Sequence, residues 1–213
     1  MTGMQDMVVF ITGAARGIGL DTAQRLYKDG ATIVLVDVDE TLAKSEAEKL
    51  GTRALGIGAD VTDQDQLDAA VAQAVQTYGR IDVALANAGI APPVEMFARS
   101  LRVEMAGTGV DVGVAYYGFV DTRLVREAFA KAGIDELRSS FPKFIAAPVP
   151  VGKAGKATAA GIRKRAARIT APRWVRATLP LRGLLQYLDG PMTKEKKVRA
   201  AVEKAEARTA ASD

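Results

Sequence analysis

The stretch MVVFITGAARGIG, residues 7–19, decides the fold of this chain. Its first five residues are apolar and largely β-branched or aromatic, which predicts a buried strand. From Gly17 onward the apolar residues recur at helical spacing until Gly30, which we expect just past the C-terminus of that helix. A strand, a glycine-rich turn and a helix N-terminus together place several free backbone N–H groups at one point. Such a point favours a phosphate group.

Three glycines are predicted to have separate roles in this turn. Gly13 permits the tight turn, Gly17 lets a ligand approach the backbone, and Gly19 lets the helix pack closely on the strand. The alternative is an ordinary connection between a strand and a helix that happens to be rich in small residues.

The first half of the chain continues as alternating strands and helices. Further strands are predicted over 31–37, 53–59 and 81–86, and helices over 39–50 and from the N-cap Thr62 to about Tyr78. Helices between strands of this length indicate a parallel sheet covered on both faces. We therefore predict an α/β fold, a doubly wound, Rossmann-like parallel sheet.

The second half is predicted to be less regular. The elements expected there are a helix opened by Pro92 and Pro93, a strand over 110–116, and helices over 122–132 and about 157–168. An apolar stripe from Trp174 to Leu188 predicts a docking helix, and the alternative is a membrane anchor. We divide the chain into a Rossmann-like domain, residues 1–150, and a basic helical extension, residues 151–213, that is not an independent domain.

Composition excludes several kinds of chemistry. The chain has no Cys and no His, which excludes disulfides, thiolate or imidazole catalysis and His/Cys metal sites, and no carboxylate cluster indicates another metal site. No apolar run is long enough to span a membrane, and residues 1–6 lack the basic segment of a secretory signal, so we expect a cytoplasmic protein.

Charge is distributed unevenly along the chain. Residues 1–150 hold 14 basic and 20 acidic side chains, whereas residues 151–213 hold 15 basic and 5 acidic ones. A basic C-terminal third is either a solvated surface or a contact for anionic partners, lipid headgroups rather than nucleic acid. No nucleic-acid partner is expected.

Four stretches in sequence order carry a family resemblance. They are TGAARGIG at 12–19, DVTD at 60–63, NAG at 87–89 and YGFVDT at 117–122. Together they resemble the short-chain dehydrogenase/reductase family over residues 5 to 130. The resemblance implies an NAD(P)-dependent oxidoreductase that acts on a small-molecule secondary alcohol or ketone and forms a homo-oligomer.

Asp37 ends the second predicted strand, where a carboxylate can accept hydrogen bonds from both ribose hydroxyls of an adenosine. A 2′-phosphate at that place would meet a like charge, so Asp37 favours NAD over NADP. By resemblance, Arg16 in the glycine turn favours the opposite choice, because a basic residue there contacts the 2′-phosphate in some members. We give Asp37 more weight, which makes NAD the expected cofactor and NADP the less favoured one.

The resemblance also implies the remaining cofactor contacts. Asp60 and Val61 would hold the adenine, Asn87, Ala88 and Gly89 would line the cofactor site, and Thr122 would contact the nicotinamide carboxamide. The residues expected to bind cofactor are Gly13, Ala15, Arg16, Gly17, Ile18, Gly19, Asp37, Asp60, Val61, Asn87, Ala88, Gly89 and Thr122.

The catalytic residues of the family have no counterpart in this sequence. Family members carry a Ser and then a Tyr-x-x-x-Lys between the stretches that match Gly89 and Gly118, but this interval contains no Lys, and no Tyr of the chain is followed four places later by Lys. A contiguous block is therefore absent, with its junction at about 93–97. Two functions stay open: a dehydrogenase that is inactive as this sequence stands, and a non-catalytic nucleotide-binding protein or truncated remnant.

Two further expectations concern the sheet and the substrate. The strand at 110–116 is expected to pair directly with the strand at 81–86, and the alternative leaves that edge unpaired. Five apolar residues indicate an apolar ligand such as a lipid-like alcohol, or simply a core: Phe129, Leu137, Phe141, Phe144 and Trp174.

Overall fold

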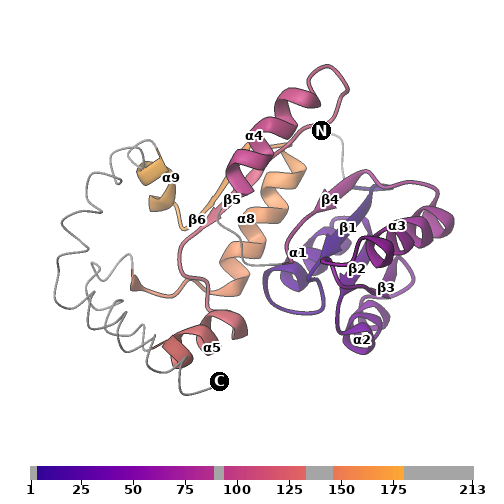
Figure 1. Cartoon of the computed structure of the whole chain (residues 1–213), viewed down its shortest axis with the longest axis horizontal. Helices are drawn as coiled ribbons and strands as arrows, with labels where there is room; N and C mark the ends of the chain where they lie inside the picture. The colour runs from indigo at the N-terminus through magenta and orange to yellow at the C-terminus, as the bar shows by residue number, and fades with distance from the viewer. Residues whose placement is uncertain (1–3, 89–93, 133–145, 180–213) are drawn as a thin grey trace. The chain divides into compact units, whose positions relative to one another are not determined.

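The computed structural model of the protein describes residues 4–88, 94–132 and 146–179 (Figure 1). The central sheet contains β1 (Val8–Thr12), β2 (Thr32–Asp37), β3 (Ala54–Gly58) and β4 (Val83–Leu85). They lie in the order β3-β2-β1-β4, and every neighbouring pair is parallel. The predicted parallel, doubly wound α/β fold is confirmed.

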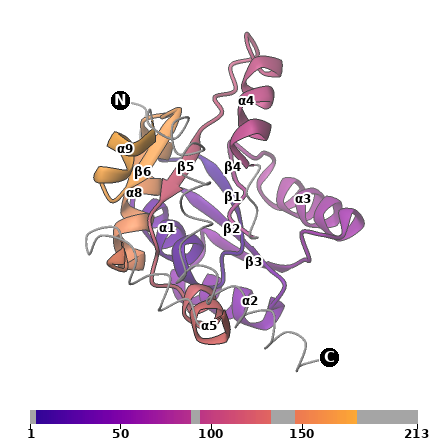
Figure 2. The ribbon, with the colours of Figure 1, turned by 60° about the vertical axis from the view of Figure 1, so that its left-hand side comes forward.

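The helices between these strands are α1 (Gly17–Lys28), α2 (Glu40–Leu50) and α3 (Gln64–Tyr78). Successive strand residues point to opposite faces of a sheet. Val9, Ile11, Ile33 and Leu35 therefore share one face and form one core cluster with Ala23 and Leu26 of α1. Val8, Phe10, Val34 and Val36 point the other way and pack with Ala70 and Ala74 of α3. Figure 2 shows α1 and α3 on opposite sides of the strands.

The ends of these helices confirm two predictions and correct a third. Gly30 follows the C-cap of α1 at a φ of 102°, as expected, and Gly51 is the C-cap of α2, as the predicted helix over 39–50 requires. The N-cap of α3 is Asp63, not Thr62, because the Asp63 carboxylate accepts a hydrogen bond from the N–H of Gln66. Thr62 instead donates its hydroxyl to the Asp60 carboxylate at 2.8 Å.

The remaining elements are α4 (Val94–Glu104), β5 (Val114–Tyr117), α5 (Arg123–Ala132), α8 (Val151–Arg163), β6 (Arg168–Ala171) and α9 (Trp174–Thr178). No helix in the described ranges has both the length and the apolar character needed to cross a membrane. The part of the predicted docking helix after Leu179 lies outside the described residues.

The expected pairing of β5 with β4 is wrong. Among the described strands β4 pairs with β1 alone, and β5 forms a separate two-stranded sheet with β6. Arg102 links the segments that lead into these two strands, because its guanidinium donates to the carbonyls of Val112 and Ala167. The helix predicted over about 157–168 included Arg168, the first residue of β6, and this strand was not predicted.

The chain forms two compact units, each built from two segments. One contains Met1–Ala115 with Gly155–Ile169, and the other contains Tyr116–Ala154 with Thr170–Asp213. The β1–β4 sheet and the helices α1 to α4 belong to the first unit. The predicted domain boundary at residue 150 stays a prediction.

Candidate functional site

The glycine turn lies where the direction of chain progression across the sheet reverses. From β1 the chain adds β2 and β3 on one side and then crosses to add β4 on the other. In open parallel sheets, ligands bind beyond the carboxyl ends of the strands at such a reversal. Gly13 follows β1 and Asn87 lies two residues beyond β4, so both stand at this edge.

The turn has a backbone that only glycine adopts easily. Gly13 and Gly17 both have a φ of 62°, in the left-handed region that disfavours other residues. At Gly19 a Cβ atom would lie 2.4 Å from the carbonyl oxygen of Gly13 and 2.8 Å from the side-chain nitrogen of Asn87. Helix α1 begins directly after this turn with no side-chain cap and no acidic residue in its first turn. The helix N-terminus is thus left for an external anion.

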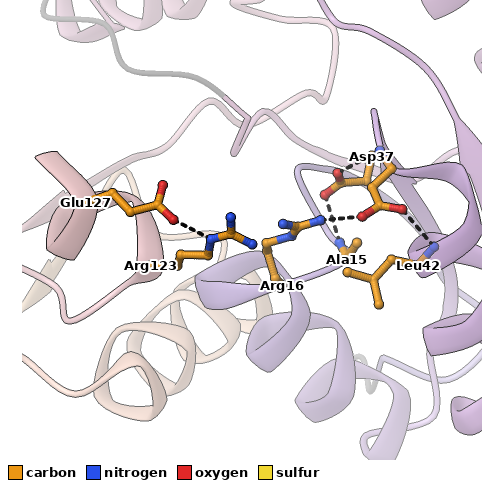
Figure 3. Close-up of polar contacts among 7 residues, drawn as sticks. Ala15, Arg16, Asp37, Leu42, Arg123 and Glu127 are labelled. Atoms are coloured by element: carbon orange, nitrogen blue, oxygen red, sulfur yellow. Dashed lines mark hydrogen bonds and ion pairs between the residues drawn. The ribbon is translucent and has the colours of Figure 1, made fainter.

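Asp37, the last residue of β2, is joined to the turn by its side chain. Its carboxylate Oδ2 accepts a hydrogen bond from the N–H of Ala15 at 3.1 Å, and Oδ1 accepts one from the N–H of Asp39 at 3.2 Å (Figure 3). The residue is only 8% exposed. An ionised carboxylate offers about four acceptor positions, so two remain after these bonds. That number matches a pair of neighbouring hydroxyl groups.

Arg16 lies in the same turn and forms an ion pair with Asp39. Its Nη2 donates to Asp39 Oδ2 at 2.7 Å, and both side chains are 43% exposed. The other Asp39 oxygen accepts a hydrogen bond from the N–H of Leu42 at 3.1 Å and caps helix α2. Arg16 was predicted as a site residue and Asp39 was not, although Asp39 is the second acid of the VDVDE segment, residues 36–40.

Asn87 and Thr12 hold the end of β4 against the turn. The Asn87 amide donates to the carbonyls of Thr12 and Gly13 at 3.1 and 3.0 Å. The Thr12 hydroxyl, which is buried, accepts hydrogen bonds from the N–H groups of Asn87 and Ala88, both at 3.1 Å. Asn87 therefore holds the backbone of the turn in place. Thr12 was quoted within the motif but was not predicted as a site residue, because a single hydroxyl gives no periodic signal.

Replacing Asn87 with alanine is expected to lower the free energy of unfolding by about 1–3 kcal/mol, because two carbonyls lose their partner at a partly buried position. Equilibrium urea unfolding measures this loss. Gln64→Ala is the matched control: it removes an amide that donates to Asp68 at an exposed helix position and is expected to cost less than about 0.5 kcal/mol. Equal costs for the two variants would contradict the assigned role of Asn87.

Asp60 and Val61 follow β3 at the same edge of the sheet. The N–H of Ala59 donates to the Asp37 carbonyl at 3.0 Å, and Gly58 pairs with Asp37, so Asp60 lies two residues beyond the paired ends of β2 and β3. The backbone and side-chain hydrogen bonds from Thr62 lower the pKa of Asp60, so its carboxylate remains an acceptor. Val61 is 37% exposed, an apolar surface open to solvent.

The residues predicted to bind cofactor do not all belong to one unit. Gly13, Ala15, Arg16, Gly17, Ile18, Gly19, Asp37, Asp60, Val61, Asn87 and Ala88 belong to the first unit, and Gly89 lies outside the described residues. Thr122 belongs to the second unit, where its hydroxyl accepts a hydrogen bond from the N–H of Val125 at 3.2 Å. Of the five apolar residues proposed for a ligand, Leu137, Phe141 and Phe144 lie outside the described residues. Trp174 begins α9.

These residues fit a dinucleotide. The start of α1 has no side-chain cap, and at Gly19 there is no room for a Cβ atom. Both features suit a pyrophosphate. The Asp37 carboxylate, fixed at both oxygens and with acceptor positions left, suits a ribose. An arrangement of this kind is able to hold and orient a nucleotide.

Comparison with known proteins gives three results. A family model described as short chain dehydrogenase matches residues 7–96. The chain is 39% identical over 118 residues to 3-hydroxyacyl-CoA dehydrogenase type-2 of Rattus norvegicus, covering 49% of this chain and 45% of that protein. It is also 39% identical over 129 residues to cyclohexanol dehydrogenase of Rhodococcus sp. (strain TK6), covering 53% of this chain and 46% of that protein. The chain thus spans about half the length of the curated relatives it matches.

A solved structure shares the fold. The crystal structure of gox2181 superposes with a TM-score of 0.67 at 19% identity, and the match covers 80% of this chain and 96% of that one. At this identity the similarity concerns the fold alone.

Proposed function

We propose that this chain, whose residues 7–96 match the model of the short-chain dehydrogenase family, binds NAD(H) at the glycine turn. The pyrophosphate would take the N-terminus of α1 at Gly17, Ile18 and Gly19. The ribose of the adenosine would take Asp37, and the adenine would lie beside Asp60 and Val61. Bound there, the cofactor supplies hydride chemistry, which the side chains of this site do not supply themselves.

The observation that carries this proposal is the hydrogen bonding of Asp37. Its two oxygens are held by the N–H groups of Ala15 and Asp39, so the carboxylate does not have to be ordered when a ligand arrives. Preorganised groups of this kind bind with a smaller loss of conformational entropy. A carboxylate also repels a 2′-phosphate, which is why we propose NAD(H) rather than NADP(H).

We further propose that the chain with this sequence does not transfer hydride. General acid–base catalysis requires a group within hydrogen-bond reach of the proton that moves. The interval between Gly89 and Gly118 contains no Lys, and no Tyr-x-x-x-Lys occurs anywhere in the sequence. The chain would therefore bind its nucleotide without oxidising or reducing a partner.

The test is a single preparation examined in two ways. Protein verified by intact mass at 22.5 kDa is first titrated with NADH, where saturable binding is expected. The same material is then assayed with NADH and a panel of ketones, and with NAD and the matching secondary alcohols, where no turnover above background is expected. Absence of NADH binding would contradict the nucleotide site, and clear turnover would contradict the proposed inactivity.

A second candidate function is a dehydrogenase acting on a secondary alcohol or ketone. Its support comes from the relatives, which are described as dehydrogenases of cyclohexanol and of 3-hydroxyacyl-CoA; both names denote secondary alcohols. Turnover in the assay above would favour this function over the non-catalytic one. Assembly into a homo-oligomer and a cytoplasmic location stay predictions.

A further inference from the structure

The ion pair between Arg16 and Asp39 lies directly beside Asp37. Arg16 follows Ala15, whose N–H donates to Asp37 Oδ2, and Asp39 donates its own N–H to Asp37 Oδ1. One cation, Arg16, and one further acid, Asp39, therefore lie beside the Asp37 carboxylate at the end of β2. The cation is turned to Asp39, at 2.7 Å.

Asp39 is held in place by hydrogen bonds that do not involve Arg16. Its Oδ1 accepts the N–H of Leu42 as the N-cap of α2, and its N–H is bound to Asp37. The carboxylate therefore loses little freedom when it forms the ion pair, and only the Arg16 side chain has to be ordered. An exposed pair of this kind shifts an equilibrium up to about fivefold. The pair is thus strong enough to bias the position of Arg16 and weak enough to be displaced.

We propose that Asp39 is a specificity-determining residue, because it holds the Arg16 guanidinium away from a phosphate on the ribose 2′ oxygen. This inference rests on the proposed NAD(H) site. Arg16 is the side chain of the glycine turn that would attract such a phosphate, so it favours NADP(H), whereas Asp37 favours NAD(H). When Asp39 is bound to Arg16, the ion pair has no net charge and Asp37 contributes an uncompensated negative charge. Discrimination against NADP(H) thus comes from two acids, one by direct repulsion and one by occupying the cation.

The decisive variant is Asp39→Asn. Asparagine is as good an N-cap as aspartate, so the hydrogen bond from Leu42 is retained while the charge is lost. NADPH is expected to bind about three- to tenfold more tightly, since Arg16 is released and one like charge is removed, and NADH affinity is expected to change less than about twofold. The readout is the dissociation constant of each dinucleotide, measured by fluorescence titration.

Asp63→Asn is the matched control. Asp63 caps α3 as Asp39 caps α2, with its carboxylate accepting from the N–H of Gln66 at 3.2 Å, and its side-chain partner is the neutral Gln66 amide. This variant makes the same change in charge and in cap chemistry and is expected to leave NADPH affinity unchanged. Thermal unfolding of both variants tests whether a change in affinity follows from lost stability.

A double-mutant cycle separates the tether from a simple charge effect. In an Arg16→Ala background, Asp39→Asn is expected to give a clearly smaller gain in NADPH affinity, because only the like charge is removed and there is no guanidinium to release. If the gain persists in full in that background, or if Asp39→Asn gives no gain while NADH still binds, this inference is overturned and the proposed function stands. Binding of neither dinucleotide to the unmutated chain would overturn the proposed function and this inference with it.

Discussion

Gly19→Ala is expected to weaken NADH binding by at least about tenfold, equivalent to about 1.4 kcal/mol. The added methyl group would lie 2.4 Å from the Gly13 carbonyl oxygen, 2.8 Å from the Asn87 amide nitrogen and 3.0 Å from the Cα of Ala14. Two of these atoms are backbone, so the turn itself has to move. Because the N-terminus of α1 is positioned by this turn, the phosphate site moves with it.

The same substitution is expected to destabilise the fold by about 1–3 kcal/mol, the usual cost of forcing an extra methyl group into a packed interior. Gly161→Ala is the matched control, because a Cβ there would lie 2.3 Å from the Ile169 side chain, on α8 and outside the proposed nucleotide site. This control is expected to lose stability but to keep NADH affinity within about twofold, well under the 1.4 kcal/mol of a tenfold change. Equal losses of NADH affinity in both variants would assign the effect to stability and contradict the role of Gly19.

Asp37→Asn is expected to change the ratio of NADH to NADPH affinity by about a hundredfold, equivalent to about 2.7 kcal/mol. The amide removes the charge that repels a 2′-phosphate, so NADPH binds more tightly. It also removes acceptor capacity at a carboxylate that binds the N–H groups of Ala15 and Asp39, so NADH binds less tightly. Like charges brought together at a binding site cost several kcal/mol, which is the scale of this effect.

The control for Asp37→Asn is Asp68→Asn. Asp68 is an exposed acid on α3 whose side chain accepts a hydrogen bond from Gln64, and its replacement makes the same change in net charge. It is expected to leave both dissociation constants unchanged. A shift of similar size in this control would mean that net charge, and not the position of Asp37, selects the cofactor.

The sequence predicted the first half of the fold because its signals are local and consistent. Residues 8–12 and 32–37 are buried strands with uninterrupted apolar residues, and glycines 30 and 51 end helices where the pattern placed them. The N-cap of α3 was assigned one residue too early because Thr62 and Asp63 are both good capping residues. Which of the two caps the helix depends on the hydrogen bonds that their side chains form, and the sequence does not show these.

The site was predictable in its residues but not in its electrostatics. Asp37 and Arg16 were both identified from their places after β2 and within the turn, and they indicated opposite cofactors. The ion pair that neutralises Arg16 depends on the side-chain direction of Asp39, which has no sequence period. The partner of β5 was mispredicted for a similar reason, because β6 is a four-residue strand that follows α8 without a strong turn signal.

We propose above that this chain binds a nicotinamide dinucleotide at the glycine turn, with Asp37 selecting against a 2′-phosphate. Parallel titrations of the unmutated chain with NADH and NADPH test it most directly. NADH is expected to bind at least about tenfold more tightly than NADPH, a difference of about 1.4 kcal/mol. Equal affinities, or tighter binding of NADPH, would contradict the role of Asp37, and binding of neither would contradict the site.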